Sequence, residues 1–299
     1  MNRSEGGGVK DFLQLMKPSL SIMVVFSSVI SYLLVPDVMY DWWRIALLFA
    51  GGLLVTGSAN TINQVVEKDT DAQMKRTAKR PIASGRLTPE QGWGFAIFTG
   101  AAGIFILGYY FNWTAGILAA FSLFLYAFVY TPLKKVNSVA VLVGAFPGAF
   151  PCLIGWVAGF VPGQQIHWLG GIVLFGIQFL WQFPHFWAIA WVAHKDYSNV
   201  GFKLLPSDKG PTKFTALQTV VYSLLMLPIT IAPFFVGICD YGTVKGVIGG
   251  VLIIAANIFL IGRAATLYNK MDVPSARKVM FGSYIHLPVV LLALLLAKA

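Results

Sequence analysis

Three oxygen-bearing side chains recur at four-residue intervals where an apolar run gives way to charged sequence. Asn63, Glu67 and Asp71 stand at positions i, i+4 and i+8. On a continuous helix this spacing places them on one stripe about 12 Å long. Carboxylate and carbonyl oxygens are the ligands that Mg²⁺ takes in proteins, commonly together with substrate phosphates. The stripe therefore predicts a site for Mg²⁺ and a phosphorylated substrate.

Basic residues follow this stripe at once. Arg76 and Arg80 are again four residues apart, with Lys75 and Lys79 beside them, and would share a face if the helix continued. Arginine binds phosphate oxygens in a bidentate manner, and carboxylates for a metal beside arginines for phosphate suit a departing diphosphate. The alternative is a solvated loop of mixed charge. It explains the lysines well but Asn63 poorly, because a polar group in an apolar run should face a cavity or a partner.

A second polar group lies in a later apolar run, around His185. Gln178, Gln182 and His185 stand at i, i+4 and i+7, and Asp196 follows His185 by eleven residues, close to three helical turns. Pro184 should kink the helix and free a carbonyl, which is tolerated beside a cavity. Three nearby tryptophans could stabilise a carbocation or stack on a flat ring, or could equally form an interfacial belt: Trp181, Trp187 and Trp191. We interpret His185 as functional rather than purely structural.

A third, smaller cluster ends the fourth apolar run. It adds positive charge and two phenols, and it consists of Tyr126, Tyr130, Thr131, Lys134, Lys135 and Asn137. Tyr130 and Lys134 are its candidate substrate-binding residues. Lysines that snorkel toward the membrane surface are the alternative interpretation.

Composition identifies the elements that must position these residues. Of the 299 residues, 57% are hydrophobic and 11% are charged, whereas soluble domains carry about 25% charged residues. A soluble protein needs a more polar surface, so the chain is predicted to face lipid. The net charge of +10 lies in short loops between apolar runs, which indicates membrane orientation rather than nucleic-acid binding. Cys152 and Cys239 form no metal-ligand pattern and are predicted to be small apolar fillers.

A membrane-spanning helix needs about 20 mostly apolar residues. The sequence predicts nine of them in one all-α domain covering residues 1–299, with 1–18 as an N-terminal tail. The spans are 19–36, 44–66, 92–111, 114–132, 138–160, 168–193, 215–237, 243–263 and 279–297. The second and the sixth both run into a polar, acid-containing segment, which indicates two similar four-helix units and one extra helix.

Orientation follows from the basic residues. Of 22 lysines and arginines, 19 fall in the N-terminal tail and in the loops on the same side, and only Arg44, Lys245 and Lys298 fall on the other. This imbalance predicts a cytoplasmic N-terminus, an external C-terminus and a site on the cytoplasmic face.

The motifs together resemble a known family. The pattern of Asn63, Glu67 and Asp71 resembles the first aspartate-rich motif of UbiA-type intramembrane prenyltransferases. Further segments resemble the protohaem IX farnesyltransferase (haem O synthase) branch: Met74 to Pro81, Gly85 to Pro89, Tyr130-Thr-Pro-Leu-Lys134, Trp181-Gln-Phe-Pro-His185-Phe and Lys195-Asp-Tyr197. The resemblance covers the first seven spans.

This resemblance implies a UbiA-like helical bundle in a bacterial inner membrane. It implies transfer of farnesyl from farnesyl diphosphate to a vinyl group of haem B, with addition of water and with Mg²⁺. Asn63, Glu67 and Asp71 would hold the Mg²⁺–diphosphate, Arg76 and Arg80 would grip the diphosphate, and His185 would serve the haem. The remaining candidate substrate-binding residues are Tyr130, Lys134, Trp181, Gln182 and Asp196. The resemblance also implies haem A synthase or the terminal-oxidase assembly machinery as protein partners. It implies no binding of nucleic acid.

Two departures from the family pattern keep alternatives open. Glu67 stands where many members carry Asp, and the second region has His185 and Asp196 in place of the DxxxD motif of quinone-type enzymes. Prenylation of an aromatic quinone precursor is therefore the first alternative. A transporter or channel is the second, and it predicts ionisable residues through the whole bilayer depth. A catalytically silent assembly factor is the third.

Overall fold

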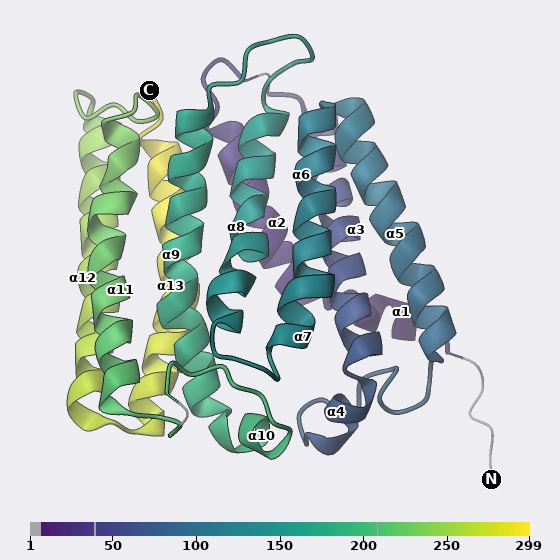
Figure 1. Ribbon diagram of the computed structural model, residues 1–299. Coiled ribbons are helices and arrows are strands. Elements are labelled where there is room, and N and C mark those ends of the chain that lie inside the picture. The colour runs from purple at the N-terminus through teal and green to yellow at the C-terminus, as the bar shows by residue number, and fades with distance from the viewer. Residues whose placement is uncertain (1–6, 39, 208) are drawn as a thin grey trace.

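The computed structural model describes residues 7–38, 40–207 and 209–299, so Arg3 of the basic tail lies outside the described residues. The described chain is a bundle of antiparallel helices (Figure 1), and its only strand-like contact is a bridge between Cys239 and Lys298. This confirms the predicted all-α class. The long helices are α2 (Pro18–Leu33), α3 (Trp42–Val66), α5 (Pro89–Tyr110), α6 (Trp113–Phe124), α8 (Ala140–Ala158), α9 (Trp168–Val192), α11 (Lys213–Ile231), α12 (Val244–Lys270) and α13 (Val273–Leu296).

Short helices lie at the ends of the long ones. They are α1 (Val9–Leu15), α4 (Lys68–Gln73), the π-helix η1 (Leu125–Tyr130), α7 (Thr131–Leu133), α10 (His194–Asn199) and the 3₁₀-helix η2 (Ala232–Phe234). Among the described residues, eight helices are long and apolar enough to cross a membrane, and the bent pair α1–α2 makes a ninth candidate. Each predicted span corresponds to one of these nine. The last two spans extend beyond the predicted limits, because Arg263, Arg277 and Lys278 lie on helices rather than in loops.

The start of the first span differs from the prediction of a plain tail. Residues 9–15 are helical, and α1 meets α2 at a bend of 51°. Lys17 lies in the left-handed region at the bend, with φ 48°. Pro18 explains the bend, because a proline disfavours helical geometry at the preceding residue and suits the first position of a new helix.

Two polar side chains of α3 fix this bend against the rest of the bundle. Asn60 Nδ2 donates to the Met16 carbonyl at 3.3 Å, and Gln64 Nε2 donates to the Leu15 carbonyl at 3.0 Å. Both side chains are buried. They pair carbonyl groups at the break between α1 and α2, and the Ser21 hydroxyl also donates to the Met16 carbonyl, at 2.6 Å.

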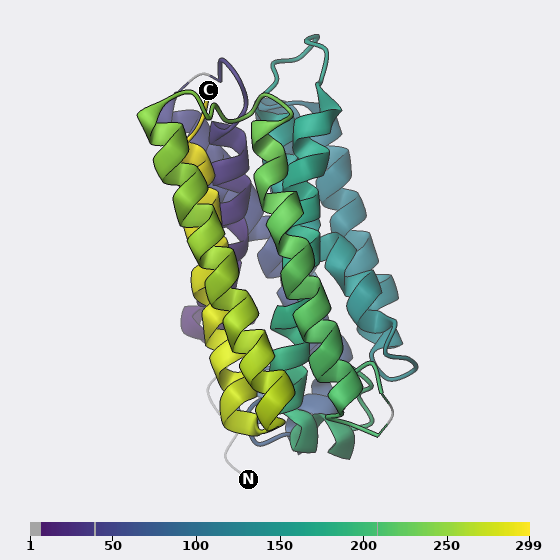
Figure 2. The same ribbon diagram turned by 90° about the vertical axis from the view of Figure 1, so that its left-hand side faces the viewer.

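Helices that follow each other in the chain pack side by side, and α13 closes the bundle by packing against both α2 and α9. Figure 2 shows α11, α12 and α13 along one side. Small residues allow close approach, as at Gly103, where an added Cβ would lie 2.7 Å from the Gly51 carbonyl oxygen. The outward surface exposes large apolar side chains such as Phe98 and Val251, as a lipid-facing surface requires.

The polar segments gather at one end of the bundle, which we call the site face. It comprises α4, α7, α10 and the segments 74–88, 200–207 and 209–212, and it lies at the bottom of Figure 1, opposite the C-terminus. Two long helices break there. Glu67 separates α3 from α4 with φ −95° and ψ 15°, and Ala193 separates α9 from α10 with φ −94° and ψ 11°.

Candidate active site

The first centre of the site is a buried triad of Asn63, Glu67 and Lys134. Asn63 Nδ2 donates to Glu67 Oε2 at 2.7 Å, and Lys134 Nζ donates to Asn63 Oδ1 at 2.8 Å. Lys134 Nζ also lies 2.7 Å from Glu67 Oε1. Glu67 and Lys134 are only 5% and 6% exposed, so their ion pair is shielded from solvent and each charge depends on the other.

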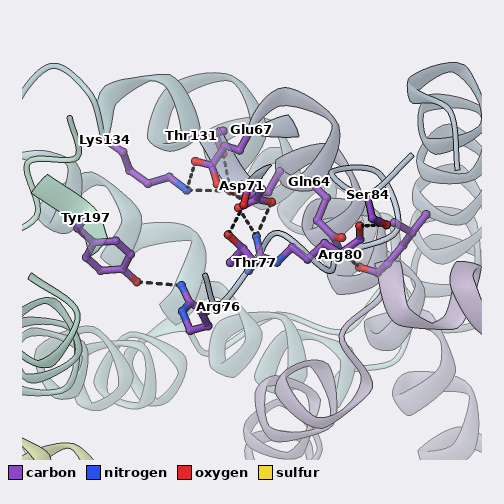
Figure 3. A network of polar contacts seen from close by, with 12 residues as sticks. Gln64, Glu67, Asp71, Arg76, Thr77, Arg80, Ser84, Thr131, Lys134 and Tyr197 are labelled. Atoms are coloured by element: carbon purple, nitrogen blue, oxygen red, sulfur yellow. Dashed lines mark hydrogen bonds and ion pairs between the residues drawn. The ribbon is translucent and has the colours of Figure 1, made fainter. Parts of the chain in front are cut away.

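Asp71 and Arg80 form the neighbouring pair. Arg80 Nη1 donates to both carboxylate oxygens of Asp71, at 2.8 and 2.6 Å, and the Thr77 hydroxyl donates to the Asp71 carbonyl at 2.8 Å. Figure 3 shows Asp71 between Arg80 and the Glu67–Lys134 pair. The structure thus brings the stripe together with Arg80 and also with Lys134, which the sequence placed in a separate cluster.

The continuous helix assumed for this segment is wrong in two places. Glu67 ends α3, and the short α4 begins after it. Met74 then turns to extended geometry, so that the arginines four residues apart do not share a helical face. Arg76 instead faces Tyr197 across the site face, with Nη2 at 3.4 Å from the phenol oxygen. Further along the segment, Gly85 adopts φ +76°, a conformation that favours glycine.

Lys17 is a site residue that the sequence reasoning treated only as a topological charge. At the α1–α2 bend it interacts electrostatically with Arg80, Lys134, Asp71 and Glu67. The clamps from Asn60 and Gln64 hold this bend in place. No spacing in the sequence links Lys17 to the stripe, and only the Lys-Pro step gives a local signal of the bend.

The oxygen atoms of Asn63, Glu67 and Asp71 can supply only part of the coordination shell of a hard cation such as Mg²⁺. Among residues 7–38, 40–207 and 209–299, no group of three or more His, Cys, Asp or Glu side chains could hold a metal ion. The cluster nevertheless supplies oxygen donors, and the buried Glu67 Oε1 has no hydrogen bond although it is ion-paired with Lys134. Mg²⁺ commonly takes one or two carboxylates and completes its shell with substrate phosphate and water. Asn63, Glu67 and Asp71 fit that pattern.

A π-helix presents the third cluster to the site. In η1 the helix widens by one residue, as π-bulges at functional sites often do, and the rings of Tyr126 and Tyr130 lie 5.2 Å apart. Lys134 Nζ lies 4.7 Å from the centre of the Tyr130 ring. Lys135 and Asn137 are exposed, so Lys134 is a buried site residue whereas Lys135 is a surface lysine.

The second centre is the ring pair of His185 and Trp181 on α9. The two rings stack with centroids 4.5 Å apart and an interplanar angle of 16°. His185 Nδ1 lies 2.8 Å from Ser283 Oγ, and Trp181 Nε1 donates to the Ser283 carbonyl at 2.9 Å. Gln182 Nε2 donates to the Ala145 carbonyl at 2.9 Å. The sequence singled out these three α9 residues but not Ser283, which comes from α13, 98 positions away from His185.

Other residues predicted for this centre lie elsewhere. Asp196 does not share a helix with His185, because α9 ends at Val192 and Asp196 belongs to α10. The Asp196 side chain makes no hydrogen bond or ion pair with another residue in the described part of the chain. Trp187 and Trp191 are buried in separate apolar clusters. Of the three tryptophans, only Trp181 lines the apolar cavity inside the bundle, which we call the central cavity.

This cavity is lined by His185 of the second centre and approaches the first centre at Tyr130, whose ring centre lies 4.7 Å from Lys134 Nζ. It has a volume of about 290 Å³ and reaches from Tyr126, Tyr130 and Tyr197 near the site face past His185 to apolar side chains such as Leu107 and Ile154. Its wall is mostly apolar, with Trp181 and Gln182 beside His185. A charged cluster next to an apolar cavity can hold a polar head group while the cavity admits an apolar tail.

Comparison with known proteins decides the family, because residues 24–285 match the UbiA prenyltransferase family. The chain belongs to the UbiA prenyltransferase family. The protoheme IX farnesyltransferase of Cytophaga hutchinsonii is 43% identical, over 96% of this chain and 97% of its own length. The enzyme of the same name from Flavobacterium psychrophilum is 38% identical, over 96% and 94%. The resemblance inferred from the motifs is confirmed.

Solved structures of UbiA-type proteins share the fold. A structure of digeranylgeranylglyceryl phosphate synthase superposes with a TM-score of 0.77, at 20% identity and over 97% of this chain and 98% of the other. A UbiA homologue from Archaeoglobus fulgidus bound to GPP and Mg²⁺ superposes with a TM-score of 0.70, at 14% identity and over 95% and 99%. These similarities confirm a UbiA-type helical bundle.

Proposed function

We propose that this chain transfers the farnesyl group of farnesyl diphosphate to a vinyl group of haem B, with addition of water, and so makes haem O. The observation that carries the proposal is a charged cluster that adjoins, through the contact of Lys134 with Tyr130, an apolar cavity whose wall carries His185. Relatives at 43% and 38% identity bear the name of this activity. We further propose that the site face is cytoplasmic and that the membrane is a bacterial inner membrane.

Asn63, Glu67 and Asp71 would hold Mg²⁺, as the oxygen donors of the cluster suggest. Bound Mg²⁺ would neutralise the charge that develops on the leaving diphosphate. Lys134 and Arg80 now neutralise the carboxylates, and with Lys17 they would contact diphosphate oxygens once a metal takes over part of that role. Arginine and lysine positioned before the reaction stabilise the departing charge without reorganisation.

The reaction begins when the bond between the first farnesyl carbon and the diphosphate oxygen breaks, and both electrons leave with the diphosphate. The vinyl π electrons of haem B then form the new carbon–carbon bond to the allylic cation. A water oxygen adds to the cation left beside the porphyrin ring and releases a proton. Tyr126, Tyr130 and Trp181 present aromatic faces to the cavity, which favour cations, and the apolar walls keep bulk water from the first cation.

Two alternatives are less well supported. The second helix break lacks the acidic pair of quinone-type enzymes, which argues against a quinone precursor as acceptor. A transport path would place ionisable groups through the bilayer depth, whereas the ion pairs Arg80–Asp71, Lys134–Glu67 and Arg86–Asp11 all lie at the site face. Delivery of the product to a haem A synthase or to oxidase assembly machinery stays a prediction.

The test is the mass of the porphyrin product. Purified protein in detergent receives haem B, farnesyl diphosphate and Mg²⁺, and a parallel reaction receives 4-hydroxybenzoate as acceptor. We expect haem that has gained one farnesyl group and one hydroxyl group, and no prenylated benzoate. Folded protein that leaves haem B unchanged would contradict the proposal, and prenylated benzoate would replace haem B as the acceptor.

A further inference from the structure

The hydrogen bonds around Ser283 determine which nitrogen of His185 carries the proton. The Ser283 hydroxyl lies 2.7 Å from the Met280 carbonyl oxygen, to which it donates. A serine hydroxyl has one proton, so once that proton is donated its oxygen can only accept. The contact of 2.8 Å between Ser283 Oγ and His185 Nδ1 is therefore a hydrogen bond only if Nδ1 is the donor. This assignment satisfies both contacts, whereas the reverse assignment leaves the Met280 contact without a proton.

With Nδ1 protonated, a neutral His185 ring has a bare lone pair on Nε2. His185 is buried, with 6% of its surface exposed, and it lines the central cavity. Within the described ranges Nε2 makes no hydrogen bond. It is also not one of the fully buried polar atoms without a partner, so part of its surface is accessible. The edge of the ring opposite Ser283 is thus left to the cavity.

Ser283 also holds the ring that stacks on His185. Its carbonyl accepts the Trp181 indole N–H at 2.9 Å, while its hydroxyl engages His185. Tyr284, the next residue on α13, closes another side with its ring centroid 4.8 Å from that of His185. Ser283 and Tyr284 of α13 therefore determine which nitrogen of His185 is protonated and how the ring is tilted. Through its bond to Trp181, Ser283 also holds the ring that covers one face of the imidazole.

We propose that Ser283 is a positioning residue that presents His185 Nε2 to the cavity as an axial ligand for the iron of the porphyrin substrate. The inference rests on the proposed function and extends it to the way the acceptor is held. A neutral imidazole nitrogen is a common iron ligand, and a ligating histidine usually donates its other N–H to a fixed acceptor. In this chain that acceptor is the hydroxyl of Ser283.

The experiment compares two porphyrins that differ only in the metal, haem B and metal-free protoporphyrin IX. Both are titrated into the purified full chain without farnesyl diphosphate, and resonance Raman spectra of the ferrous haem complex record the iron–histidine stretching band. We expect this band in the unaltered protein and its loss in His185→Ala. His185→Ala should weaken haem B binding tenfold or more and leave protoporphyrin IX binding unchanged.

Ser283→Ala tests the positioning role. Loss of an outer-shell hydrogen bond to a ligating histidine costs about 10- to 100-fold in metal affinity, so haem B binding should fall by about tenfold and the band should shift. Protoporphyrin IX binding should stay unchanged, which also shows that the variant is folded. Ser283→Thr keeps a hydroxyl and should restore the band position. Ser223→Ala is the matched control, because Ser223 is equally buried and donates to the Thr219 carbonyl of its own helix, far in sequence from His185.

Equal losses for both porphyrins in His185→Ala or Ser283→Ala would overturn the inference in favour of a role in pocket shape. A wild-type haem complex without a histidine band would also overturn it, and a proton-accepting role for Nε2 would then be the better interpretation. The product assay separates the two proposals. Farnesylated haem without the histidine band defeats iron ligation alone, whereas the band without any product defeats the farnesyl transfer alone.

Discussion

The chain breaks twice in the same way at the site face, once after α3 and once after α9. At each break one residue with nearly the same backbone angles, Glu67 or Ala193, joins a 25-residue helix to a helix of six residues. Both short helices lie at the bottom of the bundle in Figure 1. The backbone therefore repeats between the two halves, in line with the weak repeat seen in the sequence.

The side chains at the two breaks differ completely. When Glu67 is aligned with Ala193, Asn63 corresponds to Ile189 and Asp71 corresponds to Tyr197. The first break thus presents oxygen donors, and the second presents an aliphatic side chain and a phenol. We therefore expect the first half to bind the metal and the diphosphate, whereas the second half contributes His185 two turns before its break.

Removing the negative charge of the first break should have the largest effect. Glu67→Gln keeps the size of the side chain but loses a buried oxygen anion, and we expect kcat/KM for farnesyl transfer to fall about a thousandfold, equivalent to ~4 kcal/mol. Asp69→Asn is the matched control, since Asp69 is exposed on α4. A Glu67→Gln enzyme with near-normal product formation at saturating Mg²⁺ would show that the first break is not the metal site.

Loss of Lys134 should come next. Lys134→Met leaves the buried Glu67 carboxylate without its cation, and we expect about a hundredfold lower kcat/KM, or ~2.7 kcal/mol. Breaking a buried ion pair costs about 3–5 kcal/mol, so the melting temperature should drop as well, and Mg²⁺ with diphosphate should recover part of it. Lys135→Met changes an exposed neighbour and should leave both measurements unaltered. Similar behaviour of the two variants would refute a special role for Lys134.

Arg80→Lys should have a moderate effect. Arg80 contacts both oxygens of Asp71 through Nη1 alone. Lysine keeps the charge but lacks the further guanidinium N–H groups with which arginine binds phosphate as a planar fork. We expect about a tenfold rise in KM for farnesyl diphosphate with a smaller change in kcat. Arg86→Lys is the control, because Arg86 binds Asp11 and Gln14 of the N-terminal segment instead. A purely kcat-based loss would place Arg80 in the chemical step rather than in diphosphate binding.

The smallest effect is expected at the second break. Asp196→Asn changes a side chain on α10 that makes no ion pair within the described ranges, so activity and Mg²⁺ stoichiometry by calorimetry should change by less than about twofold. A loss of one bound Mg²⁺ in this variant would restore the idea of a second metal site and would make the two breaks chemically alike.

Much of the fold was predictable because hydrophobic length alone identifies spans in a membrane, as the nine segments show. Asn63, Glu67, Lys134 and His185 were predictable because polar groups in apolar runs need partners. The partners themselves were not predictable. Ser283 meets His185 only through the packing of α13 on α9, and helical periodicity placed Asp196 on the wrong element because it cannot foresee the break at Ala193.

The origin of the two centres along the chain has a consequence for biogenesis. Every member of the charged cluster comes from residues 17–134, whereas His185 receives its proton acceptor from α13, which comes much later in the chain. We therefore expect a nascent chain that has inserted the helices up to α7 to assemble the charged cluster before α13 exists. The imidazole would gain its fixed orientation only when α13 docks, so a product truncated before α13 would keep the proposed diphosphate site without an ordered ligand for haem.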